Sequence, residues 1–227
     1  MKKIRHPFLV VNPKSYLYGL RSLKFAESID NIAAKSNIQI FFTCSFTDIR
    51  YIKEHTHHLI ITAQHMDDLK PGRGMGHVLP ESLQDAGAEA VFLNHAENSL
   101  TISHLSNSII RARELGIISI ACADSLIEAT SIAKLNPDIL LCEPTDLIGT
   151  GHIADNNYVL KTTSQIKSIN SNISVMIASG ITTAQDVYNV IKLGADGTGG
   201  TSGILKAPNP VLRVQEMVDA ILKTENE

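Results

Sequence analysis

The apolar residues of this chain fall into short continuous runs that recur along most of the sequence. Inside each run one apolar side chain follows another, with little alternation between apolar and polar positions. Such continuity is typical of parallel strands that are covered on both faces. The pattern predicts seven buried strands, at residues 8–11, 38–42, 59–62, 90–93, 117–121, 139–141 and 173–177.

The segments between these runs have the spacing of amphipathic helices. The clearest one carries apolar residues at steps of three or four from Ile102 to Ala112, which places them in one stripe. Asn98 or Ser99 is expected to cap the start of this helix, and Gly116 to end it. Strands that alternate with helices predict an α/β protein with a parallel sheet.

The number of strands decides between two α/β architectures. Residues 196–200 (DGTGG) would form an eighth strand, although they lack a run of β-branched residues. With eight units, the 227 residues give about 28 residues per unit, near the lower end for a (β/α)8 barrel. Fewer strands would favour a doubly wound open sheet. No linker or low-complexity tract divides the chain, so we expect one domain over residues 1–227.

Composition adds little to this picture but argues against some partners. The chain is 44% hydrophobic and 19% charged, as expected for a compact domain with a sizeable core. Its formal net charge is -3 and its pI is about 6.3, so we expect neither a nucleic acid nor an anionic membrane as a partner. No run approaches the roughly 18 apolar residues of a membrane helix, and we expect a cytoplasmic protein.

The thiols and imidazoles suggest no metal or disulfide framework. Cys44, Cys122 and Cys142 are far apart, and each ends or nearly ends an apolar run. We therefore expect buried free thiols. No metal site is expected, because no zinc-binding spacing is present among the histidines at positions 55, 57, 58, 65 and 77.

Two glycine-containing segments carry candidate chemistry. In residues 142–151 (CEPTDLIGTG), Glu143 follows a predicted strand and is either a base beneath a closing lid or part of an ordinary turn. Residues 197–203 (GTGGTSG) fail the G-x-G-x-x-G dinucleotide pattern, because Ser202 occupies the third glycine position. In a barrel, the loop after the last strand can cradle phosphate with backbone N–H groups and the hydroxyls of Thr201 and Ser202. The alternative is a tight turn.

Taken in order, several stretches resemble the triosephosphate isomerase family, especially its short archaeal-type form. Residues 12–14 (NPK) are similar to the Asn-x-Lys that follows the first strand, and residues 93–98 (LNHAEN) to the histidine motif of the fourth. Residues 63–88 resemble the third barrel loop with the helix after it, and residues 142–151 resemble the catalytic glutamate with its lid. The resemblance spans nearly the whole chain and implies a (β/α)8 TIM barrel with aldose–ketose isomerase activity.

The resemblance also implies a role for each site residue. Glu143 would be the base that moves a proton between adjacent carbons through an enediolate, and His95 would donate to its oxygens as a neutral imidazole, as is known for this family. Lys14 would balance the negative charge of the substrate, and Asn12 would add a donor. Glu97 would support the lysine.

The phosphate and the partners are implied in the same way. Backbone N–H groups at Gly149, Gly180, Thr201 and Ser202 would hold the phosphate of a small-molecule substrate. No cofactor is implied, because this proton transfer needs none. A homodimer or homotetramer is expected, with the loop at residues 72–78 in the contact.

Three departures from the family keep alternatives open. Ala96 replaces a serine, Pro13 replaces an aromatic residue, and the glycine-rich eighth strand could widen the phosphate end or leave room for a longer substrate. One alternative is therefore an isomerase of a related sugar phosphate, such as a four-carbon erythrulose phosphate. Another is a non-catalytic barrel that binds a phosphorylated metabolite.

Overall fold

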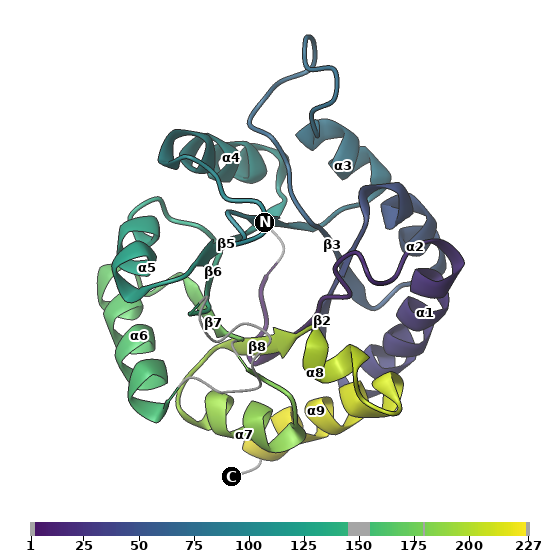
Figure 1. Cartoon of the computed structure of the whole chain (residues 1–227), viewed down its shortest axis with the longest axis vertical. Helices are drawn as coiled ribbons and strands as arrows, with labels where there is room; N and C mark the ends of the chain where they lie inside the picture. Colours follow the sequence, from purple (N-terminus) through teal and green to yellow (C-terminus); the bar gives the residue numbers. More distant parts are fainter. Residues whose placement is uncertain (1–2, 145–154, 179, 226–227) are drawn as a thin grey trace.

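Eight parallel strands close into a barrel in chain order, and helices surround it (Figure 1). The structure, a computed structural model, describes residues 3–144, 155–178 and 180–225. The (β/α)8 prediction is confirmed, and the open sheet is excluded because β1 pairs with both β2 and β8. The strands are β1 (Phe8–Val11), β2 (Gln39–Cys44), β3 (Leu59–Ala63), β4 (Ala90–Leu93), β5 (Ile118–Ala123), β6 (Ile139–Cys142), β7 (Ser174–Ile177) and β8 (Gly197–Gly200).

The helices lie outside the strands and cover their outer face (Figure 1). In chain order, the helices of the described residues are α1 (Gly19–Ser36), the 3-10 turn η1 (Phe46–Asp48), α2 (Ile49–His55), α3 (Pro80–Ala86), α4 (Ile102–Leu115), α5 (Leu126–Ala133), α6 (Asn156–Ile169), α7 (Ala184–Lys192), α8 (Ser202–Leu205) and α9 (Pro210–Glu225). None of them is long and apolar enough to cross a membrane.

Successive residues of each strand point to opposite faces, which divides the core into two clusters. Phe8, Phe41 and Phe92 belong to the cluster inside the barrel. Leu9 belongs to the second cluster, together with residues of the surrounding helices such as Ile29 of α1. Because both faces of the strands are covered, the strands read as continuous apolar runs in the sequence. All three cysteines are free and buried, as predicted.

Two of the glycines of β8, Gly197 and Gly199, are required by the close approach of β1. A Cβ atom at Gly197 would lie 2.3 Å from the ring of Phe8, and one at Gly199 would lie 2.1 Å from the carbonyl oxygen of Val10. Such distances are far below van der Waals contact, so larger residues do not fit. Gly197 and Gly199 therefore do not widen the phosphate end, because Phe8 and the β1 backbone occupy the space. Gly200 lines the cavity, and a Cβ atom there would lie 3.4 Å from the Ile181 carbonyl oxygen.

The predicted start of α4 was also wrong by a few residues. Thr101 caps the helix with its side chain, whereas Asn98 and Ser99 lie outside it. The later start puts Ile102 at the first helical position, where it is 61% exposed instead of buried in the stripe. The end was predicted correctly, since Gly116 ends the helix in a left-handed conformation with φ of 69°.

The loop between β3 and α3, residues 64–79, projects beyond the ring of helices (Figure 1). Its two ends are joined at the base, where the backbone N–H of Asp67 donates to the Val78 carbonyl at 3.0 Å. The backbone N–H of Val78 in turn donates to the Asp67 carboxylate at 2.6 Å. Met75, within the projecting part, is fully exposed. The loop is thus held by hydrogen bonds at its base and exposes an apolar side chain.

Candidate active site

Five segments that follow strands converge on one cavity of about 820 Å³. Asn12 follows β1, His95 follows β4 and Glu143 follows β6, and all three line the cavity. Gly180, beyond β7, and Thr201, directly after β8, line it as well. The cavity therefore lies at the carboxyl ends of the strands, the end at which barrels of this type carry their active sites.

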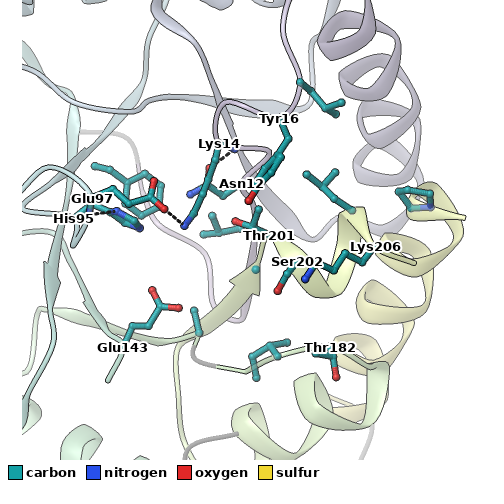
Figure 2. A pocket seen from close by; sticks show the side chains of 18 of the residues that line it. Asn12, Lys14, Tyr16, His95, Glu97, Glu143, Thr182, Thr201, Ser202 and Lys206 are labelled. Atoms are coloured by element: carbon teal, nitrogen blue, oxygen red, sulfur yellow. Dashed lines mark hydrogen bonds and ion pairs between the residues drawn. The ribbon is translucent and has the colours of Figure 1, made fainter. Parts of the chain in front are cut away.

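Lys14 is held by contacts to its backbone and to its side chain. Its φ of +48° is left-handed, a conformation that costs a non-glycine residue about 1–2 kcal/mol. Two hydrogen bonds fix this conformation, one from the Lys14 N–H to Asn12 Oδ1 at 2.9 Å and one from Gln64 Nε2 to the Lys14 carbonyl at 3.0 Å. The ammonium pairs with Glu97 Oε1 at 2.7 Å. The Lys14 side chain is thereby held at the cavity wall (Figure 2).

His95 is held in one tautomer by the tight turn that follows β4. The backbone N–H of Glu97 donates to His95 Nδ1 at 3.1 Å, so Nδ1 carries no proton and the proton of the neutral ring is on Nε2. Burial lowers the pKa of His95 from its ordinary value, and the nearby charge of Lys14 lowers it further, while Glu97 opposes the shift. His95 is therefore a neutral imidazole at neutral pH, with an N–H available as a donor.

Glu143 lies across the cavity from His95 and Glu97, and its carboxylate points into the cavity (Figure 2). Its backbone N–H donates to the Ala123 carbonyl at 3.0 Å, which continues the pairing of β6 with β5 beyond the strand end. Burial raises the pKa of Glu143, Glu97 adds to the rise, and Lys14 opposes it. A carboxylate with a raised pKa is a stronger base than an ordinary surface glutamate.

The predicted phosphate residues form a third part of the same cavity. Gly180, with φ of +72°, lines it together with Thr201 and Ser202, and Ser202 is the first residue of α8. Gly149 lies outside the described residues. The structure thus brings every other predicted site residue to the cavity wall.

Sequence reasoning missed the residues that position the site. Asn94 adopts a left-handed conformation with φ of 58°, and its side-chain amide donates to the Cys122 carbonyl and to Glu128, both at 3.0 Å. These bonds fix the chain directly before His95. An asparagine at a strand end is a weak signal for such a conformation. Gln64 gave no signal, since its partner Lys14 is distant in sequence.

The cavity also extends past the predicted residues, toward α1 and α8. Arg21 and Lys24 of α1 and Lys206 at the end of α8 line this part, and the sequence gave no reason to group them. Among residues 3–144, 155–178 and 180–225, no three His, Cys, Asp or Glu side chains are grouped so that they could hold a metal ion.

The fold and the cavity define the class of protein: a (β/α)8 barrel with acid–base groups at the carboxyl ends of its strands, as in barrel enzymes. Comparison with known proteins gives the particular family. Residues 7–220 match the family model described as triosephosphate isomerase, and the chain belongs to this family.

Curated relatives with the name triosephosphate isomerase cover nearly the full length of the chain. The protein from Sulfolobus acidocaldarius is 32% identical over 225 residues, which is 97% of each chain. That from Sulfurisphaera tokodaii is 31% identical over the same share of both chains. That from Methanocaldococcus jannaschii is 32% identical over 94% of this chain and 99% of its own. The resemblance to the short archaeal-type form is thus confirmed.

Proposed function

We propose that this protein interconverts D-glyceraldehyde 3-phosphate and dihydroxyacetone phosphate, as a cytoplasmic enzyme of glycolysis and gluconeogenesis. The observation that carries the proposal is the convergence of Glu143, His95 and Lys14 on one cavity from three separate strands. Family membership supports the same reaction. Neither a cofactor nor a metal takes part in the proposed steps.

The proton transfer is assigned to Glu143 and His95. The Glu143 carboxylate removes a proton from the carbon next to the substrate carbonyl and returns it to the neighbouring carbon. The raised pKa of Glu143 makes the carboxylate better matched to this step. The enediolate oxygens that develop charge accept a hydrogen bond from His95 Nε2, the nitrogen that carries the proton in the tautomer fixed by Glu97. A neutral donor serves here because it can also exchange a proton with the oxygens.

Charge balance is assigned to Lys14, Asn12 and Glu97. The ammonium of Lys14 offsets the negative charge of the intermediate, and Glu97 holds that ammonium at 2.7 Å. Asn12 Oδ1 accepts from the Lys14 backbone, so the amide of the same side chain is left to donate to substrate. Asn12 therefore has two roles, one structural and one at the substrate.

Phosphate binding is assigned to the backbone at Gly180, Thr201 and Ser202, with Gly149 as a further donor from the predicted lid. Glycine at position 180 adopts a left-handed φ that other residues rarely take, and the segment lines the cavity. The hydroxyls of Thr201 and Ser202 add donors for an anion.

The test is a coupled isomerase assay in both directions on the wild type and on Glu143→Gln. The amide cannot accept the proton, so we expect kcat to fall by about 100- to 10,000-fold, the usual contribution of a positioned general base. Binding of a phosphate-bearing inhibitor should change little, because the isosteric substitution leaves the phosphate region intact. Equal turnover by the two proteins would contradict the assignment and favour a non-catalytic barrel.

A related sugar phosphate is the alternative substrate within the same chemistry. A panel that includes a four-carbon erythrulose phosphate separates the two, since the alternative requires faster turnover of the longer sugar. Gly197 and Gly199 do not favour it, because Phe8 and Val10 take up the room that these two glycines leave.

We further propose that the protein is a homodimer or homotetramer, with the projecting loop at the contact. The loop is braced at Asp67, and the Met75 side chain is fully exposed. A fully exposed large apolar side chain on a projecting loop is suited to burial in a partner subunit.

A further inference from the structure

The cavity is larger than a triose phosphate requires. Its volume is about 820 Å³. A water molecule takes up about 30 Å³ of liquid, so a substrate of about ten non-hydrogen atoms fills less than about 300 Å³. The lining of the cavity also includes Arg21, Lys24 and Phe25 of α1 and Leu205 and Lys206 at the end of α8. We refer to this part of the cavity wall as the α1–α8 arm.

The charges that line the cavity are separated along its length. Glu97 and Glu143 are the only acidic side chains among its described lining residues, and both are at the catalytic end. Lys206 lies on the opposite side from them, with Thr201 and Ser202 in between (Figure 2). The arm therefore carries positive charge without a carboxylate, in a chain whose formal net charge is -3.

The three cations of the arm are not used by the fold. Lys14 is paired with Glu97, but Arg21, Lys24 and Lys206 form no ion pair with another side chain of the described residues. Arg21 and Lys24 are three residues apart on α1, so they share one side of the helix. All three residues line the cavity and are exposed. They are available to an anion that enters it.

Apolar side chains line the same part of the cavity wall. Phe25 is buried, and Leu205 is partly buried against the outer core. Apolar side chains lower the local dielectric constant and strengthen the attraction between an anion and nearby cations. The arm thus combines cationic and apolar side chains.

We propose that the α1–α8 arm is a second anion subsite, which takes the far anionic group of an elongated metabolite phosphorylated at both ends. The phosphate closer to the catalytic residues lies at Thr201 and Ser202. This position is the one assigned in the proposed function, on which the inference rests. A linear bisphosphate is held at both ends, whereas a monophosphate of the same length is held at one. Such compounds occupy the substrate position and inhibit the isomerase competitively.

The test uses alkane diols of increasing length, phosphorylated at one end or at both. Binding is measured by calorimetry and competition by inhibition of the isomerase assay. We expect one chain length at which the bisphosphate binds about tenfold more tightly than its monophosphate, the sum of a few exposed charge pairs. The advantage should shrink as salt is raised, because exposed charges are screened.

The combined substitution Arg21→Gln, Lys24→Gln and Lys206→Gln should remove this advantage and leave KM for triose phosphate nearly unchanged. Lys35→Gln is the matched control, since Lys35 is an exposed cation in the last turn of the same helix but does not line the cavity. It should leave the advantage of the bisphosphate intact.

Two results would overturn the inference. One is equal affinity for the bisphosphate and monophosphate at every length, and the other is an advantage that survives the triple substitution. If monophosphates bind and turnover is normal, either result refutes only the subsite. Absence of isomerase activity together with absence of monophosphate binding would refute the proposed function instead.

Discussion

Lys14 illustrates how the site depends on single residues. Its left-handed backbone is held by Asn12 and Gln64, and its ammonium is held by Glu97. The same ammonium influences the protonation of two further groups, since it lowers the pKa of His95 and limits the rise in the pKa of Glu143. One charge therefore tunes both the base and the donor of the proposed reaction.

This coupling predicts opposite effects of two substitutions on the pH profile of kcat/KM. In the wild type, the acid limb should lie above the pH at which an ordinary glutamate titrates, because the pKa of Glu143 is raised. Lys14→Met removes an opposing positive charge, so the pKa of Glu143 should rise and the limb should move to higher pH. Glu97→Gln removes a negative charge, so the limb should move to lower pH.

The measurement is steady-state kinetics over a pH series for all three proteins with the same substrate. The substrate phosphate titrates near pH 6, but it affects each protein equally, so the differences between proteins report the enzyme. Lys14→Met should also lower kcat by about 100- to 1,000-fold, the usual result of removing one positioned charge-stabilising group. Shifts in the same direction for both variants would contradict the electrostatic account.

At the scale of elements, β8 closes the barrel with the least possible side-chain volume. Its glycines lie opposite β1, and the ring of Phe8 fills the interior where a β8 side chain would otherwise be. Closure is also reflected in the neighbouring Thr198, whose hydroxyl donates to the Ile177 carbonyl of β7 at 2.7 Å. The formation of β8 therefore depends on contacts with β1 and β7 more than on the strand propensity of its own residues.

Gly197→Ala should lower the free energy of unfolding by about 1–3 kcal/mol, the usual cost of an overpacked core. The added Cβ would meet the Phe8 ring, so the combination with Phe8→Leu should cost less than the sum of the two single changes. Gly199→Ala is the comparison, because its Cβ would meet the Val10 backbone, which no side-chain change can remove. Urea unfolding of the wild type and of the four variants gives these free energies. Additive effects of Gly197→Ala and Phe8→Leu would contradict this packing.

At the scale of the whole molecule, the loop between β3 and α3 projects farther from the ring of helices than the other described segments do (Figure 1). It begins directly after β3, and Gln64 at its start contacts the Lys14 carbonyl. A partner that binds the loop would therefore act on a segment connected to the site. This links the proposed assembly to the proposed activity.

Met75→Glu should shift the assembly toward monomers in sedimentation velocity at fixed protein concentration. A glutamate in an apolar contact would be buried without a partner, which is unfavourable by several kcal/mol. Leu212→Glu is the matched control, because Leu212 is an exposed apolar residue of α9, on the far side of the barrel from the loop. Unchanged sedimentation of Met75→Glu would remove the loop from the interface, and a monomeric wild type would remove the assembly.

Several parts of the structure could be predicted from particular residues. The apolar runs located seven strands, because a strand covered on both faces must be apolar throughout. The order of the motifs around Lys14, His95 and Glu143 placed them at strand ends, and all three line the cavity. The eighth strand was ambiguous, since its identity depends on Phe8, nearly 190 positions away.

The sequence by itself determined the alternation of strands and helices, the family, and the residue types of the candidate site, because these follow from local periodicity and from motifs. Only the tertiary structure decided the tautomer of His95, the pKa directions of His95 and Glu143, and the contact of Gln64 with Lys14. It alone brought Arg21, Lys24 and Lys206 to one wall of the cavity. The physical reason is that burial, electrostatic coupling and cavity shape depend on distances between residues that are remote in the chain, and barrel closure sets those distances.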